Sequence, residues 1–563
     1  MSLNSLIRTT IFHLSLTLLM TPFAAPFYPQ CASAQQQAFT AEDNHALLYA
    51  KQMQFASDGS PVVRMRIADN LNALRITPKK SFIVYPDGPG GSYIELPGNE
   101  TYTLTSTTPF PGKYHYAIIL ARSRDAADLK NNHKFDKLDT QLETISLGSI
   151  FALKGKLFDN REHLLITSRT DDKSLALKQL ETIKSQFPDD DFELYDELQA
   201  YPRLTVVLSN ASGSTRVVNA NLMWLNFDNT TVTVHDIPDE YGKKRDLILN
   251  SQLIVTPDAS ANLSLVQAAS VETILRGILP AEIFASAPDA ALQAQAIAAR
   301  TTLISQIGAR HLADPFHLCN RQHCQVYNGL NAAAPSTDRA IEQTRGQILF
   351  SGNELVKAYY SAHCGGSSAT ANETWALPDM PYLTAKQDTP SHQSSPTTEQ
   401  QVRDLVDHSP DQSDAFCAKP PKNQKKFSSS KHAHWDITVS AGDIINALKK
   451  QGVAIHTIES IEVLSRGPSG RVTRLRIAGN QKEYIIEREL PIRRFFGGLK
   501  SALFYFDIKK SGNAIQSVTF HGSGFGHGAG LCQTGAIGMA QRQYDALTIL
   551  NHYYPGTHVE KLW

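Results

Sequence analysis

An acidic side chain in an apolar stretch is the first feature of this sequence that could do chemistry. Residues 276–301 read RGILPAEIFASAPDAALQAQAIAART and contain two acids, Glu282 and Asp289. Pro288 suits the first position of a helix, and Asp289 then lies where the helix dipole favours a negative charge. Glu282 is left without such a structural role. It is therefore either a general acid or base at a loop-to-helix junction, or a helix cap or solvated acid.

The helix expected directly after Glu282 would carry a basic residue behind that acid. Residues 290–307 are rich in Ala, Leu and Gln, which are good helix formers. Apolar residues recur there at three- and four-residue spacing, as on one buried face. Arg300 lies on the same helix. It could support the acid, or it could be a solvated or salt-bridged helix residue.

A second cluster contains residue types that bind zinc. His317, Cys319, His323 and Cys324 lie within eight residues. Zinc favours such Cys and His ligands, although four ligands so close in sequence would strain a tetrahedral site, and one from elsewhere, such as His311, could be needed. The alternative is a disulfide between Cys319 and Cys324. The sequence leaves both open.

The other cysteines bear on the same question. The chain has six cysteines, and Cys31 lies within residues 1–34, the expected signal peptide, which leaves five in the mature protein. An odd number leaves at least one thiol free or bound to metal. Cys364 and Cys417 flank much of a polar stretch, residues 386–432, for which we expect a loop or mobile insertion. A disulfide between these two cysteines would fasten it.

The N-terminus predicts export. An apolar run over residues 11–25 is followed by Ala32-Ser-Ala34, the form of a signal peptidase site. We expect residues 1–34 to be a signal peptide, since a lipoprotein signal ending at Cys31 lacks the usual small residues before the cysteine. No other run is long enough to cross a bilayer. The mature protein is then exported, periplasmic or in the cell envelope, without a transmembrane segment.

Length and charge limit the remaining possibilities. The chain has 563 residues, too many for one core, and its 54 basic and 54 acidic side chains balance. No basic stripe suggests a nucleic-acid partner. Hydrophobic patterning predicts an α+β fold with a β-rich region at 35–145, a small strand–helix–strand module at 146–214, and a long mixed region at 215–563. The helix of the small module is expected at 173–187, with Leu177, Leu180 and Ile183 on one face. In the mixed region we expect paired strands at 247–258 and 262–269, a β-hairpin that turns at 351–353, and a helix that starts at Ser440.

Within the mixed region, several motifs occur in an order that resembles the SpoIID/LytB domain family. They are Gly277-ILPAEI, Ala291-LQAQAIAART, Cys319-x4-Cys324-QVYNG, Tyr360-SAHCGG, Ser469-GRV, Gly526-HGAGLCQTGAIGMA and Tyr553-YPGT. Each motif is weak alone, but together they are specific. The resemblance covers residues 215–563 and implies a mixed β-sheet and helix catalytic domain there.

The resemblance implies a cell-wall protein. The family includes lytic transglycosylases, which cut the glycan strands of peptidoglycan, and proteins described as enhancers of N-acetylmuramoyl-L-alanine amidases. It implies that Glu282 is the catalytic acid/base and that Arg300 is a supporting active-site residue. Some members bind zinc near the segment of Cys319 and Cys324. A biological setting such as sporulation is compatible with the family.

The chemistry of a lytic transglycosylase needs only one carboxyl group. It protonates the glycosidic oxygen and then takes a proton from the muramic C6 hydroxyl, which closes a 1,6-anhydro ring. Ordinary glycosidases need paired carboxylates. Such an acid works best with its pKa raised toward neutrality by an apolar setting. Ile278, Leu279, Ile283 and Phe284 flank Glu282 and could supply that setting.

Three further residues are expected to line a glycan cleft. His527 lies in the glycine-rich run of residues 521–530, and Gln533 follows it. The run could approach a glycan closely, or it could be a tight turn that packs the last helices. Tyr360 could stack on a sugar ring or lie in the core. Gln293 and Cys532 stand where the family often has Lys and Ser, which keeps a non-catalytic amidase enhancer as the alternative function.

Overall fold

The computed structural model describes residues 41–86, 88–187, 192–239, 242–321, 323–375, 377–391, 394–407, 414–418 and 430–563. These residues belong to one compact unit, residues 39–563. The predicted signal peptide, residues 1–34, lies outside them. Helices and several separate β-sheets make up the described part, so the predicted α+β class is confirmed.

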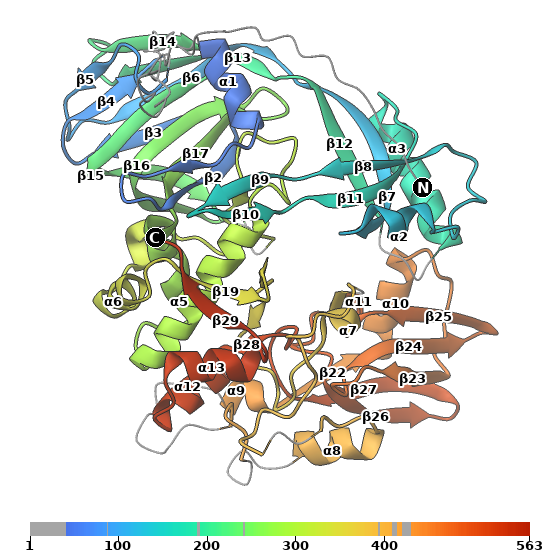
Figure 1. The fold of residues 1–563 in the computed structure, drawn as a ribbon. Helices are drawn as coiled ribbons and strands as arrows, with labels where there is room; N and C mark the ends of the chain where they lie inside the picture. Colours follow the sequence, from blue (N-terminus) through green and yellow to red (C-terminus); the bar gives the residue numbers. More distant parts are fainter. Residues whose placement is uncertain are drawn as a thin grey trace, which may run out of the picture. The chain divides into compact units, whose positions relative to one another are not determined.

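A large, mainly antiparallel sheet dominates the first half of the chain (Figure 1). Its strand order is β1-β2-β17-β16-β15-β3-β6-β13-β14, with β4, β5 and β18 attached at its sides. The strands are β1 (Gln54–Phe55), β2 (Pro61–Leu71), β3 (Ala73–Pro78), β4 (Phe82–Tyr85), β5 (Ile94–Leu96), β6 (Tyr102–Phe110), β13 (Arg203–Asn210), β14 (Arg216–Ala220), β15 (Met223–Pro238), β16 (Lys244–Pro257), β17 (Leu263–Ser270) and β18 (Leu318–Cys319).

The central strands of this sheet are apolar because they are covered on both faces. β17 is buried over almost its whole length. The predicted pairing of the strands that precede Glu282 is confirmed, since β16 and β17 are antiparallel neighbours. The sheet takes strands from each of the three stretches 35–145, 146–214 and 215–563. The predicted boundaries between those stretches remain predictions.

A smaller four-stranded sheet, in the order β12-β7-β11-β8, packs against two helices. The elements are β7 (Lys113–Ser123), α2 (Ala126–Lys130), β8 (Leu142–Leu147), β11 (Glu162–Thr167), α3 (Lys173–Gln186) and β12 (Glu193–Ala200). The predicted amphipathic helix is confirmed as α3, which Asp172 caps. Leu180 and Ile183 are buried, but Leu177, expected on the same face, is exposed. A hairpin of β9 (Ile150–Leu153) and β10 (Lys156–Asp159) lies between β8 and β11 in sequence.

Two helices carry the acidic stretch. α4 (Val271–Glu282) follows β17 directly, and Ser270 caps it by accepting a hydrogen bond from the Thr273 N–H. α5 (Asp289–Gln306) then begins after Pro288. The predicted helix is confirmed as α5, which begins one residue after its expected first position, Pro288. The junction before it differs from the expected loop, because Glu282 is the last residue of the preceding helix, α4. The buried apolar residues before Glu282 already have helical spacing, which extends α4 upstream.

α5 is the centre of the domain that follows. It is buried along most of its length and contacts α4, α6 (Pro335–Gln343), α12 (Gln533–Gln541) and α13 (Ala546–Tyr553). The predicted hairpin is confirmed as β19 (Gln347–Ser351) and β20 (Glu354–Leu355), and β29 (His558–Lys561) pairs with β19. Small side chains on α5 let these helices approach closely. Figure 1 shows α12 and α13 side by side beside β28.

A long segment of the chain separates two strands that pair directly. β21 (Tyr360–Ser361) runs parallel to β28 (Leu531–Cys532). Between them, two three-stranded sheets, β22-β27-β26 and β23-β24-β25, enclose a hydrophobic core of their own with α10 and α11. The elements are α7 (Ala371–Trp375), α8 (Glu399–Asp407), α9 (Ser430–Ala433), β22 (Trp435–Ser440), α10 (Ala441–Lys450), β23 (Ser460–Arg466), β24 (Val472–Gly479), β25 (Lys482–Glu487), α11 (Glu489–Phe495), β26 (Phe504–Ser511) and β27 (Ala514–Gly522).

Two predictions for this segment had different outcomes. The helix expected after Ser440 is confirmed as α10, with the Ser440 side chain as its cap. The polar stretch 386–432 is not simply a loop, because the described part of it contains α8. Val402 and Val406 anchor that helix against β26. Four-residue spacing of these two valines makes the short apolar face.

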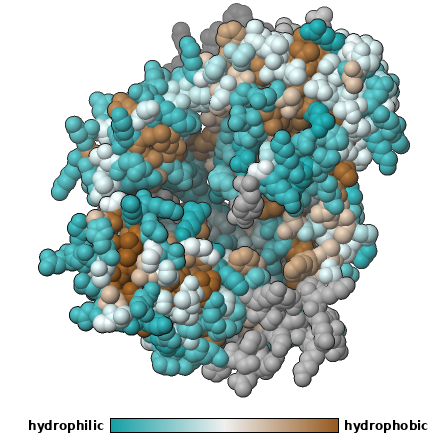
Figure 2. Space-filling view, turned by 180° about the vertical axis from the view of Figure 1, so that it is seen from behind, coloured by the Kyte–Doolittle hydropathy of each residue, from teal (hydrophilic) through white to brown (hydrophobic). Residues whose placement is uncertain are grey.

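The surface seen from behind in Figure 2 is largely hydrophilic, with hydrophobic residues gathered in separate patches. Among the described residues, no helix is both long enough and apolar enough to span a bilayer.

Candidate active site and metal-ligand group

Glu282 lies half-buried at the last residue of α4. Burial raises its pKa from the ordinary 4.5 to about 7, although the nearby Val326 backbone N–H and Gln533 side-chain amide favour the charged form. Ile278, Leu279 and Ile283 are buried beside it, whereas Phe284 is exposed. The apolar setting expected for a catalytic acid is thus provided by the first three residues.

The predicted residues Tyr360 and Gln533 meet Glu282 here. Burial raises the pKa of the Tyr360 phenol well above its usual value, and the nearby charge of Glu282 raises it further. The Tyr360 hydroxyl donates to Gln325 Oε1 at 3.0 Å. Gln533 is the first residue of α12, and it is 7% exposed. These side chains come from α4, β21 and α12, which are distant in sequence.

His527 lies beside this group and forms an aromatic cluster. The ring centroids of His527 and Trp375 are 4.8 Å apart. The ring centroids of Trp375 and Tyr359 are 4.3 Å apart. Burial and the charge of Arg471 lower the pKa of His527 to about 3, so the imidazole is neutral. The His527 Nδ1 accepts a hydrogen bond from the Ala529 N–H. All three rings are partly exposed.

Trp375 and Tyr359 were not singled out from the sequence. A Tyr-Tyr pair at 359–360 and a tryptophan in a polar stretch are weak signals, but together they mark rings that could contact a sugar.

The glycine-rich run has a clear packing role. Gly530 has φ +71, and a Cβ there would lie 2.0 Å from the Tyr359 carbonyl oxygen. The backbone of β28 can therefore pair with β21 only if this position is glycine. This supports the tight-turn interpretation, while His527 within the same run still faces the aromatic cluster.

Arg300 is fully buried and bound to another acid. Its guanidinium forms a salt bridge with Glu272, with Nη2 2.7 Å from Oε2 and Nε 3.0 Å from Oε1. Further N–H groups reach Thr344 and the carbonyls of Ile341 and Gln347. These bonds connect α4, α5, α6 and β19. A positioning role follows, and a direct part in catalysis stays a prediction.

Two other residues of the stretch have structural roles. Asp289 is exposed in the first turn of α5, as expected for an acid that favours the helix dipole. The Gln293 side chain donates to Gln343 of α6 at 2.8 Å. Gln293 therefore joins two helices.

Four side chains form a group that could hold a metal ion. His311, Cys319, His323 and Cys324 each offer a ligand atom, and these atoms lie within 4.8 Å of one another. The two sulfurs are 3.4 Å apart, and His311 Nε2 is 3.4 Å from the Cys324 Sγ. Tetrahedral zinc with bonds of about 2.0–2.3 Å separates its ligand atoms by roughly 3.5–3.8 Å. The donor set and its spacing fit zinc.

This group differs from the predicted one at a single position. His317 lies outside it and is completely buried, with Nδ1 accepting from the Arg64 N–H at 3.1 Å. Burial, with the charges of Arg64 and Lys51, lowers the pKa of His317 well below its usual value. His317 is therefore a neutral core residue, and His311 takes its place. His317 points toward Arg64 and His311 points toward Cys324, and sequence spacing does not predict these directions.

Neither predicted disulfide is present among the described residues. Cys319, Cys324, Cys364, Cys417 and Cys532 are all free thiols. The sulfurs of Cys364 and Cys417 are 3.6 Å apart, whereas a disulfide requires about 2.05 Å.

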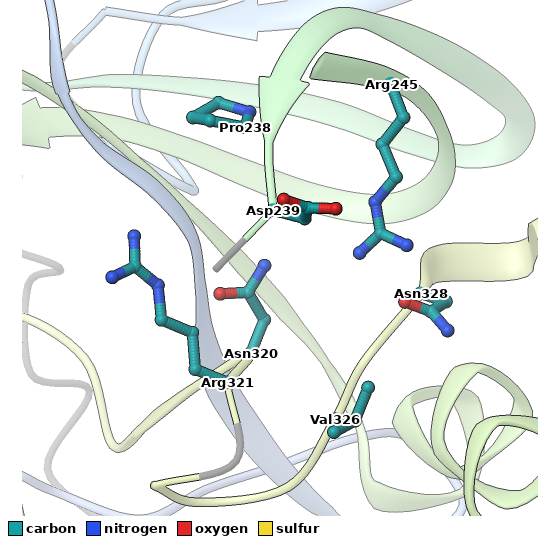
Figure 3. Close-up of a pocket in the computed structure, with 7 residues that line it drawn as sticks. All are labelled: Pro238, Asp239, Arg245, Asn320, Arg321, Val326 and Asn328. Carbon is teal, nitrogen blue, oxygen red and sulfur yellow. The ribbon is translucent and has the colours of Figure 1, made fainter. Parts of the chain in front are cut away.

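The loop that follows the metal-ligand group connects it to Glu282 and to a pocket. Val326 donates its backbone N–H to Glu282 and also lines a pocket of about 210 Å³. Asn320, Arg321 and Asn328 line the same side, and the ends of β15 and β16 supply the other (Figure 3). Asp239 and Arg245 on that side make the pocket polar and charged. A polar ligand is therefore better suited to it than an apolar one.

Comparison with known proteins agrees with the motifs. A family model described as "Stage II sporulation protein", SpoIID, matches residues 259–350, which contain Glu282 and the metal-ligand group. The resemblance to the SpoIID/LytB family that the motifs predicted is therefore confirmed over residues 259–350. A second model, a domain of unknown function (DUF8618), matches residues 369–530. In the structure, that match covers nearly all of the segment between β21 and β28, which we call the inserted segment.

Individual relatives are similar over about half of the chain. An "Amidase enhancer" of Bacillus subtilis is 28% identical over 50% of this chain and 40% of its own length. An uncharacterized protein of Brachyspira hyodysenteriae is 29% identical over 52% of this chain and 66% of its own. A "Stage II sporulation protein D" of Bacillus amyloliquefaciens is 24% identical over 58% of this chain and 85% of its own length. The chain thus covers less than two thirds of the first two relatives. A role related to peptidoglycan follows from the family.

Proposed function

We propose that the protein is an exported lytic transglycosylase that cuts peptidoglycan glycan strands, with Glu282 as its single general acid and base. The observation that carries this proposal is the carboxyl of Glu282, whose pKa burial raises to about 7. Near neutral pH such a group is populated both as an acid and as a base, as both halves of the reaction require.

The chemistry balances with one carboxyl group. Protonated Glu282 gives its proton to the glycosidic oxygen as the bond from that oxygen to muramic C1 breaks. The resulting carboxylate takes the proton of the muramic C6 hydroxyl, and the C6 oxygen bonds to C1. The ring closes as a 1,6-anhydro product, and Glu282 ends protonated again. No water is consumed.

The surrounding residues favour a sugar substrate. Tyr360 and Gln533 lie against Glu282 and can hydrogen-bond hydroxyl groups. The partly exposed rings of Tyr359, Trp375 and His527 offer apolar faces to a sugar ring. We propose zinc for the group of His311 and its neighbours, where it would hold the loop that presents Val326. In this proposal zinc has a structural role.

The test uses the chain from residue 35 and glycan strands without stem peptides. We expect 1,6-anhydromuramic products by mass spectrometry, and a loss of about 10²–10⁴-fold in rate for Glu282→Gln. Asp289→Asn, a matched change of an exposed acid seven residues away, should keep the activity. Hydrolytic products without the anhydro ring, or full activity of Glu282→Gln, would exclude the proposal.

A second candidate function rests on the relative named "Amidase enhancer". In that case the protein binds glycan strands and stimulates an N-acetylmuramoyl-L-alanine amidase without cutting them. Adding the protein to such an amidase and measuring release of stem peptides separates the two. Stimulation that survives Glu282→Gln, with no anhydro products from either protein, would favour the enhancer.

A further inference from the structure

Three cysteines and an aspartate meet in a second buried group. The sulfurs of Cys364, Cys417 and Cys532 and a carboxylate oxygen of Asp388 lie within 4.8 Å of one another. Each of these residues is at most 1% exposed. Cys364 Sγ is 3.6 Å from Cys417 Sγ and 3.4 Å from Asp388 Oδ2. Ligands of one tetrahedral zinc ion lie roughly 3.8 Å apart for two sulfurs and 3.5 Å for sulfur and oxygen.

Asp388 is oriented as a ligating carboxylate usually is. Its Oδ1 accepts a hydrogen bond from the Tyr553 hydroxyl at 2.9 Å and lies 3.1 Å from His552 Nε2. These contacts leave Oδ2 to face Cys364. Outer residues that hold a carboxylate in this way are typical of metal sites.

The sulfur of Cys532 is also held in place. It accepts hydrogen bonds from the backbone N–H groups of Cys364 at 3.2 Å and Gly535 at 3.3 Å. Donors of this kind stabilise a thiolate. Arg471, itself 1% exposed, donates to the Cys364 carbonyl at 2.7 Å and places a positive charge nearby.

A disulfide would satisfy this group poorly. A disulfide could join only two of the three sulfurs and would leave the third as a thiol or thiolate. The buried carboxylate of Asp388 would still lie next to sulfur without a cation. A buried carboxylate and thiolates are stable only when a cation or hydrogen bonds compensate their charge. One metal ion would use all four side chains at once.

We propose that Cys364, Cys417, Cys532 and Asp388 bind one zinc ion in a closed, structural site. Sulfur-rich donor sets select zinc over magnesium or calcium. Four protein ligands leave no open position for a substrate. The site fastens the inserted segment at its base, since Asp388 and Cys417 lie inside the match at 369–530 and Cys364 and Cys532 flank it.

The site also adjoins the candidate active site. Cys532 directly precedes Gln533, and the strand that begins with Tyr360 leads to Cys364. Zinc here would hold the ends of β21 and β28 together. It would thereby keep Tyr360 and Gln533 against Glu282. The cysteine at 532 is then a ligand and not a defect of the catalytic site.

The test is a metal count on the full chain after leader removal, purified without chelator. We expect two zinc ions per chain by elemental analysis, and one in each of the paired variants Cys319→Ser/Cys324→Ser and Cys417→Ser/Cys532→Ser. A single zinc in the unmodified protein, lost in the first variant and kept in the second, would overturn the proposal.

A second measurement does not depend on whether Cys417→Ser/Cys532→Ser folds. The variant Cys319→Ser/Cys324→Ser keeps only the proposed site of Cys364, Cys417, Cys532 and Asp388. When this variant is loaded with Co(II), that site should give a thiolate-to-cobalt charge-transfer band with the intensity expected for three sulfur ligands. Alkylation of the unmodified protein in denaturant without reductant should modify all three cluster cysteines. Absence of the band, or a Cys364–Cys417 disulfide found by mass spectrometry, would contradict zinc binding.

Discussion

Glu282 differs from Asp289, the other acid of its stretch, in what surrounds it. Asp289 is exposed at the start of α5, whereas Glu282 is half-buried among apolar residues and faces Gln533 and Tyr360. A carboxyl group therefore lies in the first turn of a helix at one position, where it favours the helix dipole, and can exchange protons near neutral pH at the other.

The raised pKa of Glu282 predicts how activity and stability depend on pH. Glycan cleavage needs the protonated acid, so kcat/KM should fall as pH rises through about 7. For stability, the folded pKa lies above the ordinary 4.5, so the contribution of Glu282 is fully present below pH 4.5 and is lost as pH rises through about 7.

Chemical unfolding of Glu282→Gln and the unmodified protein checks the sign. At pH 5 the two free energies of unfolding should be similar. At pH 8 the variant should be more stable by about 1–3 kcal/mol, because it carries no buried charge. Asp289→Asn should show no such pH-dependent gain. A gain for Glu282→Gln that is the same at both pH values would contradict a raised pKa.

The two histidines near the metal-ligand group give a matched pair of variants. His311→Ala should lose one zinc ion per chain, because His311 Nε2 lies 3.4 Å from the Cys324 Sγ. His317→Asn should keep that zinc, since the His317 imidazole accepts from the Arg64 backbone outside the group. Elemental analysis of folded protein measures both. Loss of zinc in His317→Asn alone would restore the assignment expected from sequence spacing.

The loop at residues 323–329 packs closely against α4 because position 277 in that helix is glycine. A Cβ on Gly277 would lie 2.4 Å from the Tyr327 ring and 2.7 Å from the Gly329 carbonyl oxygen. The Tyr327 hydroxyl donates to Gln267 at 2.6 Å, which fixes the ring. Val326, which donates to Glu282, is the residue before that tyrosine.

Gly277→Ala should therefore displace this loop. We expect a loss of about 1–3 kcal/mol in the free energy of unfolding, as for other overpacked cores, together with lower glycan-cleaving activity. Gly442→Ala in α10 is the control, since the nearest atom to its added Cβ is 3.6 Å away. That change should be neutral or stabilising by up to about 1 kcal/mol. Equal effects of the two changes would argue against close packing at Gly277.

The Arg300–Glu272 salt bridge connects α5 to α4 inside the core. Glu272 Oε1 also accepts from the Gly346 N–H at 3.1 Å and from Trp563 Nε1 at 3.0 Å. Arg300→Met should lower the free energy of unfolding by about 3–5 kcal/mol, because it leaves a buried carboxylate unpaired. Adding Glu272→Gln to Arg300→Met should recover part of that loss. If Arg300→Met stays as stable as the parent but loses activity, Arg300 acts in the chemistry.

The inserted segment has its own core, yet the candidate site depends on both of its ends. β21 before it and β28 after it pair in parallel and bring Tyr360 next to Gln533. Cys364, Cys417, Cys532 and Asp388 converge at that junction. Assembly of the site therefore requires contacts between residues more than 150 positions apart, on the order of a whole domain.

Metal removal should consequently affect the whole chain. A strong chelator should lower the thermal midpoint by a few degrees, because a ligand present at about 100 times its Kd adds about 2.7 kcal/mol to stability. Zinc should restore the midpoint, whereas magnesium should not, because seven of the eight proposed ligand atoms are sulfur or nitrogen. Differential scanning calorimetry measures this. An unchanged midpoint in a chain shown to have lost its zinc would exclude a structural role for the metal.

The sequence alone determined the fold class and the resemblance to the SpoIID/LytB family, and it singled out Glu282 as the candidate acid. Local patterns predicted these features: the apolar stretch around Glu282, the helical spacing in α3 and α10, and the short apolar strands before α4. Motifs in a fixed order carried the family. Such features depend on neighbours within a few residues, and sequence shows those neighbours directly.

Only the tertiary structure decided which distant residues meet. It replaced His317 with His311, directed Arg300 to Glu272, and brought Trp375 to His527. It also converted the expected Cys364–Cys417 pair into a group of four with Cys532 and Asp388. Spacing along a chain limits how far apart residues can be but not where side chains point. Packing of α5 against its neighbours and the pairing of β21 with β28 set those directions.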